Sequence, residues 1–109
     1  MPIDLKRVIR FLDQPAEATE WFATLGLEDV RRASKNLEDM ARAGLTLDLL
    51  AVICTQLERY LPRISDPDMA LNNLDRFVAA ARNPLSLGSL FERDDESLPT
   101  LLRIFSSSQ

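Results

Sequence analysis

The sequence predicts an all-α fold, a single compact bundle of about six to seven short helices. Apolar residues recur at spacings of three and four along most of the chain, which is the period of an amphipathic helix. No segment alternates apolar and polar residues as a strand would, and the hairpin dipeptides Asn-Gly and Asp-Gly are absent. The 109 residues suit one domain and are too few for two ordinary ones. Residues 1–109 are therefore expected to form one helical domain.

Three helices are expected before Gly44. Asp4 can cap the first, and Pro15 lies where the second begins. Gly26 and Gly44 fall where helices often end in a left-handed conformation. The positions expected to face the core in these helices are Leu5, Val8, Ile9, Leu12, Ala18, Phe22, Leu25, Val30, Ala33, Leu37, Met40 and Ala41.

The neighbouring aromatic residues Trp21 and Phe22 allow two interpretations. Aromatic side chains dominate the energetics of many interfaces, so the pair could be an exposed anchor for a partner. An aromatic pair in a small domain more often fills the core, because each ring buries a large apolar area. We favour the core.

Residues 47–61 form the most hydrophobic segment and are expected to be the central helix. Thr46 is a suitable N-cap, and Pro62 ends the helix. A helix that is apolar on most sides is buried on most sides. Cys54 is interpreted as a small buried hydrophobe, because the chain has no histidine to activate its thiol. The main apolar face comprises Leu47, Leu50, Ala51, Cys54, Leu57 and Leu61, with Leu49, Val52, Ile53 and Tyr60 covering much of the rest.

Further helices are expected after Ser65. Ser65 or Asp66 can cap the first of them, with Pro67 in its first turn, and capping also accounts for Asp68. The last helix has an apolar stripe that continues almost to Gln109. The apolar positions of these two helices are Leu71, Leu74, Phe77, Val78, Ala81, Leu98, Leu101, Leu102 and Phe105.

No catalytic, cofactor-binding or metal-binding residue is assigned. The absence of histidine excludes a Ser-His-Asp triad and histidine metal sites, and a single cysteine excludes a zinc cluster. The three glycines stand too far apart for a phosphate loop. The acidic run from Glu92 to Glu96 lacks the spacing and the glycine of a calcium loop. It is expected to be a solvated turn after a short helix around Leu87, Leu90 and Phe91.

Composition and charge exclude several classes of partner. The net charge is −4, whereas nucleic-acid-binding domains usually carry a basic face, so no nucleic acid is expected. Lys6, Arg7 and Arg10 lie on the first helix and are more typical of a solvated face than of a membrane-surface element. No stretch approaches the ~20 apolar residues of a membrane span, and the N-terminus does not have the pattern of a secretory signal. The expected compartment is the cytoplasm.

Three sequence segments in the last third to half of the chain resemble part of one enzyme family. The segments are DPDMALNNLDRF (66–77), AARNPLSLGSLFERD (80–94) and LPTLLRIFSSSQ (98–109). In this order they resemble the N-terminal helical region of the glutamine synthetase adenylyltransferase/adenylyl-removing enzyme family. In that family the region precedes the first nucleotidyltransferase domain.

This resemblance implies that the chain is an N-terminal, non-catalytic accessory domain of a larger protein. The parent enzyme would move AMP onto and off glutamine synthetase with ATP and Mg²⁺, under control of a PII-type signal protein. The Gly-Ser and paired-aspartate motifs of that chemistry belong downstream of this region, so no catalytic residue carries over. The expected partners are the downstream nucleotidyltransferase domain, glutamine synthetase and the PII-type protein.

A free-standing helical interaction module of death-fold-like type is the alternative, because several short helices in about a hundred residues suit that fold too. The last helix distinguishes the two hypotheses. In an adaptor module it should close the bundle. In an accessory domain it should leave an exposed apolar stripe at Leu101, Leu102 and Phe105. The hypothesis that the chain is an independent enzyme is not supported by any recognisable set of catalytic residues in the sequence.

Overall fold

A computed structural model describes residues 3–81 and 97–107 of the chain. These residues form six α-helices, one 3-10 turn and no strand, which confirms the all-α prediction. The radius of gyration of 12.5 Å is close to the ~13 Å expected of a compact domain of about this size. The helix expected around Leu87, Leu90 and Phe91 and the acidic run that follows it lie outside the described residues. The elements are α1 (Leu5–Asp13), α2 (Pro15–Thr24), α3 (Val30–Arg42), α4 (Leu47–Tyr60), the 3-10 turn η1 (Leu61–Arg63), α5 (Pro67–Ala80) and α7 (Ser97–Ser107).

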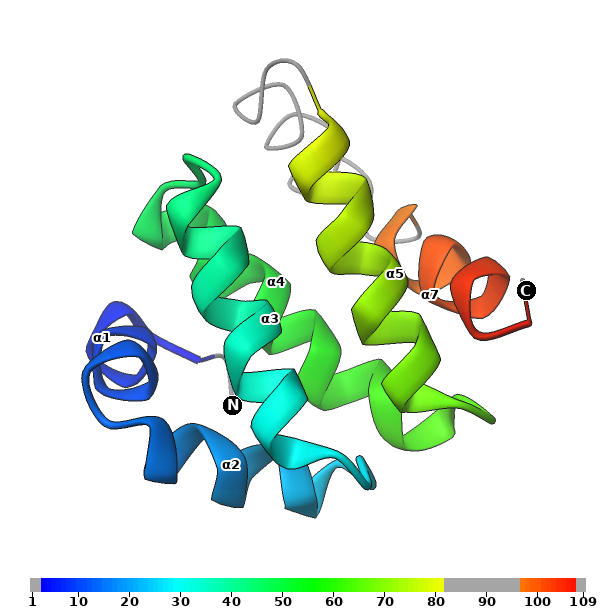
Figure 1. The fold of residues 1–109 in the computed structure, drawn as a ribbon, viewed down its shortest axis with the longest axis horizontal. Helices are drawn as coiled ribbons and strands as arrows, with labels where there is room; N and C mark the ends of the chain where they lie inside the picture. Colours follow the sequence, from blue (N-terminus) through cyan, green and yellow to red (C-terminus); the bar gives the residue numbers. More distant parts are fainter. Residues whose placement is uncertain (1–2, 82–96, 108–109) are drawn as a thin grey trace.

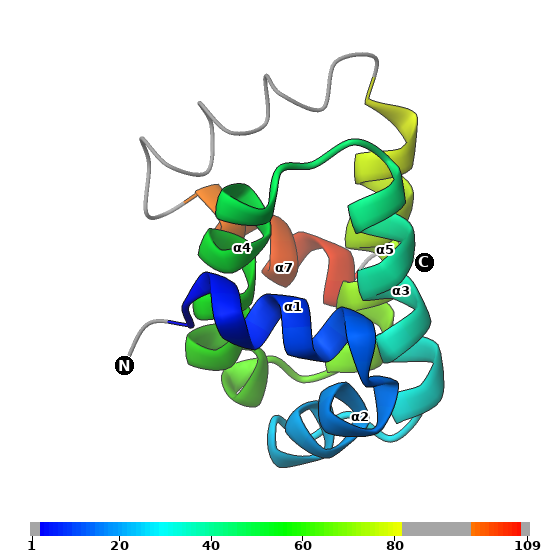
Figure 2. The ribbon, with the colours of Figure 1, turned by 90° about the vertical axis from the view of Figure 1, so that its left-hand side faces the viewer.

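The helices form a bundle in which α3 and α5 run side by side and α4 lies behind them (Figure 1). Helix α2 crosses one end of the bundle. Helices α1 and α7 lie on opposite sides, and each is seen nearly end-on in Figure 1. Figure 2 shows α1 across the front of the molecule, with α7 behind it. The first and last described helices therefore present separate surfaces.

Short polar side chains begin four of the helices, and the sequence predicted three of these caps, at Asp4, Thr46 and Asp66. Each side chain accepts a hydrogen bond from the backbone N–H three residues later, which satisfies one donor that the helix leaves without a partner. Gly26 and Gly44 follow α2 and α3 with φ values of 96° and 109°, a left-handed conformation that side chains disfavour. The caps are Asp4, Asp29, Thr46 and Asp66.

Helix α4 supplies more buried side chains than any other helix of the described chain, in line with its expected central role. The expectation for Leu47 is wrong, because its side chain is 40% exposed. Leu47 is the first residue of the helix, and the buried sector extends instead toward the opposite flank at Leu49 and Ile53. The buried residues of α4 are Leu49, Leu50, Ala51, Ile53, Cys54 and Leu57.

The aromatic residues of α1 and α2 form one stacked cluster inside the bundle. The rings of Phe11 and Trp21 are stacked with centroids 4.8 Å apart, and those of Trp21 and Phe22 are 4.7 Å apart. Phe22 is fully buried and Trp21 is only 6% exposed, so the core interpretation of this pair is confirmed.

This cluster also sets the rotation of α1 and corrects the predicted face of that helix. Val8 and Phe11 are buried, whereas Leu5 and Ile9 are 41% and 50% exposed. The sequence pattern predicted that residues 5, 8, 9 and 12 form the buried face of α1, and it did not include Phe11. Stacking of the Phe11 ring on Trp21 turns the helix toward that side, which moves Leu5 and Ile9 to an exposed flank.

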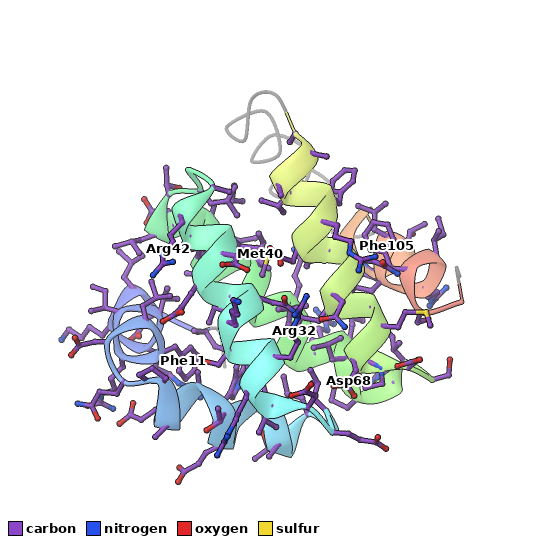
Figure 3. All side chains as sticks on the ribbon, in the orientation of Figure 1. Phe11, Arg32, Met40, Arg42, Asp68 and Phe105 are labelled. Atoms are coloured by element: carbon purple, nitrogen blue, oxygen red, sulfur yellow. The ribbon has the colours of Figure 1, made fainter. Side chains whose placement is uncertain are left out.

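Polar side chains also join helices that are far apart in the sequence. The Asn36 Nδ2 atom of α3 donates a 2.6 Å hydrogen bond to Asn72 Oδ1 of α5. Asp68 does not cap its own helix, contrary to expectation. Its two carboxylate oxygens accept the backbone N–H groups of Glu28 and Asp29, each at 3.0 Å, in the loop before α3. Figure 3 shows Asp68 at the end of α5 that faces this loop.

Candidate functional site

The last helix was expected to carry an exposed apolar stripe or to close the bundle, and α5 covers much of that stripe. Leu98 and Leu102 are fully buried. The rings of Phe77 on α5 and Phe105 on α7 lie 5.9 Å apart between centroids. The Asn73 side-chain amide donates a 2.8 Å hydrogen bond to the backbone carbonyl of Phe105. Figure 3 shows Phe105 beside α5. Leu102 is therefore a core residue and not part of an exposed surface.

One apolar side chain of α7 nevertheless faces outward, and two partly buried apolar side chains lie next to it. Ile104 is 52% exposed, and Leu101 and Phe105 are half-buried. Ile104 and Phe105 lie three and four positions after Leu101, so both are neighbours of Leu101 on the helix surface. We call these three residues the α7 outer face. Ile104 is the most exposed large hydrophobic side chain of the described residues, which makes this face a candidate contact surface.

A second candidate is a polar hollow of about 420 Å³ between α1, α2 and α4. Oε2 of Glu58 accepts a 2.7 Å hydrogen bond from Nε1 of Trp21 and lies 3.8 Å from Nη1 of Arg7. At the rim, Arg10 Nε and Glu17 Oε2 are 3.7 Å apart. These four charged groups pair with one another. We interpret this hollow as structural.

The cysteine shows no sign of reactivity. Cys54 is fully buried in α4. Burial raises the pKa of its thiol to about 12, the nearby Arg7 lowers it somewhat, and Glu58 raises it. The thiolate is the reactive form of cysteine, so this thiol is inert at neutral pH, as the sequence predicted.

Within residues 3–81 and 97–107, no group of three or more acidic or cysteine side chains lies where it could hold a metal ion. In the same ranges, no helix is long and apolar enough to span a membrane. No protein-family model, curated protein or solved structure matches the chain. The candidate surfaces are therefore described from their own geometry.

Sequence reasoning missed the polar partners of this domain. The bond from Trp21 to Glu58 and the bonds to Asp68 join residues at least thirty-seven positions apart. Helical periodicity gives no signal for such pairs. A weak signal existed at Asp68, because Asp66 already caps α5 and leaves the second aspartate available for another role.

Proposed function

We propose that the chain is the non-catalytic, N-terminal accessory domain of a cytoplasmic enzyme that resembles glutamine synthetase adenylyltransferase. The sequence resemblance is the first support. The residues that carry it within the described ranges form α5 and α7, which pack together, and Leu71, Leu74, Leu98 and Leu102 of these helices are fully buried. The residues that carry the resemblance are therefore largely helix-packing residues, as expected of a scaffold region.

The observation that carries the proposal is the α7 outer face. The side chain of Ile104 is 52% exposed, whereas Leu98 and Leu102 of the same helix are fully buried. An apolar face on a scaffold helix is suited to contact with another domain. In this proposal the α7 outer face contacts the downstream nucleotidyltransferase domain of the same protein.

The chemistry of the proposal belongs to the parent enzyme. ATP and Mg²⁺ would bind in its nucleotidyltransferase domain, where paired aspartates hold the metal against the phosphates. Glutamine synthetase and a PII-type signal protein would be the protein partners. This domain would support the first nucleotidyltransferase domain or contribute to contacts with glutamine synthetase.

One observation favours the second candidate, a free-standing helical interaction module. Leu98 and Leu102 are fully buried, so α7 closes the bundle over part of its length as the last helix of an adaptor would. The two candidates differ in what the α7 outer face binds: a domain of the same protein or a separate partner.

Two experiments test the accessory role. The reading frame after Gln109 should encode a Gly-Ser motif and a paired-aspartate motif. The protein of residues 1–109 should then bind the separately expressed downstream domain, measured by calorimetry. Ile104→Lys should weaken this binding, whereas Ile9→Lys should not, because Ile9 is equally exposed but lies on α1 at the opposite side of the bundle (Figure 1).

Activity assays complete the test. Residues 1–109 alone should neither add AMP to glutamine synthetase nor remove it. Either activity in a preparation free of the parent enzyme would contradict the non-catalytic role. Absence of the downstream motifs, or equal binding by the two lysine variants, would shift support to the free-standing module.

A further inference from the structure

The partly exposed side of α4 carries a hollow of about 320 Å³, next to the segment that leads into α1. Ile3 lines it from that segment, and the other described lining residues belong to α4. The α4 residues recur at spacings of three and four between Ala51 and Tyr60, so they share one side of the helix. The hollow therefore lies between two parts of the chain that only the fold brings together.

Two short hydrogen bonds hold these two parts in place. The backbone N–H of Ile3 donates a 2.9 Å bond to Oγ1 of Thr55, fifty-two positions later. The Thr55 hydroxyl in turn donates a 2.8 Å bond to the backbone carbonyl of Ala51. Ile3 is only 3% exposed, so its side chain is packed against the bundle. The walls of the hollow are therefore formed before any ligand arrives, and the apolar groups among them are Ile3, Ala51, Val52 and the ring of Tyr60.

One charged side chain lines the hollow, that of Arg59. Its Cζ atom lies 5.5 Å from the centroid of the Tyr60 ring, over the face of that ring. A guanidinium placed over an aromatic face keeps the N–H groups of its edge available for hydrogen bonds. Within residues 3–81 and 97–107, no acidic side chain forms an ion pair with Arg59. The positive charge beside the hollow is therefore not neutralised by a carboxylate of the described chain.

The carboxylates nearest along α4 are directed or placed elsewhere. Oε2 of Glu58 accepts the indole N–H of Trp21 and lies 3.8 Å from Arg7, on the side of α4 that faces α1 and α2. Asp48 shares the side of the hollow, but it lies eleven residues before Arg59, roughly 16 Å along the helix axis. The site thus combines a single cation with an apolar floor, in a chain of net charge −4.

We propose that this hollow binds a small monocarboxylate with an aromatic or branched apolar body. The fork of one guanidinium matches the two oxygens of one carboxylate, and a single cation suits a ligand with a single negative charge. The apolar body would lie against Ile3, Ala51 and Val52. The volume of the hollow is near the lower end of the ~300–1,000 Å³ range of small-molecule sites, so the ligand is small. This site is separate from the α7 outer face and does not depend on the proposed function.

Titration of the whole chain with three probes, followed by amide NMR, tests the site. Phenylacetate should bind and shift the amide signals of Ile3 and of the second half of α4. Phenylacetamide has the same shape without the charge, and acetate has the charge without the ring, so both should bind more weakly. Arg59→Gln should weaken phenylacetate binding by roughly tenfold or more, because a charge-assisted hydrogen bond is lost.

A second variant tests the apolar part of the site. Val52 is half-buried at the hollow, so Val52→Phe should fill part of the space and weaken binding without removing a charge. Arg32→Gln is the matched control for Arg59→Gln. Arg32 is exposed on α3, and α4 lies behind that helix in the view of Figure 3, so its loss should leave binding unchanged. Circular dichroism checks the fold of each variant.

Four results would overturn the proposal. Equal effects of Arg59→Gln and Arg32→Gln would mean general charge attraction. Equal affinity for phenylacetate and phenylacetamide would mean that the carboxylate is not recognised. Unchanged binding by Val52→Phe would place the ligand outside the hollow. The fourth is no binding of phenylacetate to the unmodified chain at millimolar concentration.

Discussion

The indole nitrogen Nε1 of Trp21 donates a 2.7 Å hydrogen bond to Oε2 of Glu58, thirty-seven positions later in the chain. The bond satisfies the one polar atom of an indole that is otherwise packed against Phe11 and Phe22. It connects α2 to α4, and the same carboxylate lies near Arg7 of α1. Glu58 is thus the polar junction of three helices.

Loss of this junction should destabilise the domain. Glu58→Ala should lower the free energy of unfolding by about 1–3 kcal/mol, because the partly buried indole N–H loses its charged acceptor. The ion pair with Arg7 contributes little, since both side chains are partly exposed. Urea denaturation measures the change. Glu20→Ala, which removes an exposed carboxylate from the same hollow, should change stability by less than about 0.5 kcal/mol. Equal effects of the two variants would reject the role of Glu58.

Truncation of the core of α4 should have a larger effect. Leu50 is fully buried, so Leu50→Ala should cost about 2–5 kcal/mol through lost apolar burial and the cavity that remains. Leu47→Ala is the matched control on the same helix, and its cost should be well below that of Leu50→Ala because Leu47 is 40% exposed. A denaturation midpoint of Leu50→Ala within error of the unmodified chain would contradict the assignment of α4 to the core.

Asp75 should make stability depend on pH. Burial raises the pKa of this carboxyl above its ordinary value of 3.8, Asp39 raises it further, and Arg32 and Arg76 lower it. The unfolded chain therefore releases the Asp75 proton at a lower pH than the folded chain does. The contribution of this group to stability falls as the pH rises from 3.8 through the raised pKa, and it is constant above that value.

Asp75→Asn removes this titration. The variant should gain stability relative to the unmodified chain at pH 7 and show little of that gain at pH 3. Urea denaturation at the two pH values measures the difference, with Glu20→Gln as a control for loss of one surface charge. Parallel pH profiles for Asp75→Asn and the unmodified chain would show that burial of Asp75 has no energetic effect.

The thiol of Cys54 should be unreactive in the folded protein. With its pKa raised to about 12 and its side chain fully buried, almost no accessible thiolate is present at pH 8. An aromatic disulfide reagent should label Cys54 slowly in buffer and rapidly in denaturant. Equally rapid labelling in both would mean that α4 opens readily or that Cys54 is not in the core.

The helices and their caps were predictable because local chemistry determines them. Asp4, Thr46 and Asp66 cap their helices, and the positive φ values at Gly26 and Gly44 follow from the glycine pattern. The rotation of each helix was less predictable. In α1 the apolar stripe is wider than the buried sector, and the choice of sector depends on the contact of Phe11 with Trp21.

The candidate surfaces were harder to predict than the helices. The stripe on α7 was recognised, but Leu102, which the accessory hypothesis expected to be exposed, is buried, and the exposed residue is Ile104, which the predicted stripe did not include. The sequence gives no signal for the polar hollow at Glu58, because Glu58 is far along the chain from Arg7 and Trp21 and has no periodic relationship to them. Pairings of this kind are set by tertiary packing, which a single sequence does not reveal.

The Asp68 carboxylate links hydrogen exchange in the connection between α2 and α3 to a distant part of the chain. Amide protons of a short surface loop ordinarily exchange with water through small local openings. Those of Glu28 and Asp29 are held by a side chain forty and thirty-nine positions later, so they exchange when the Asp68 carboxylate releases them, by rotation of its side chain or by movement of the first turn of α5. Loss of the carboxylate in Asp68→Ala should therefore speed the exchange of two amides that lie in a different loop. Two amide signals of the connection between α2 and α3 thus report on a contact with α5.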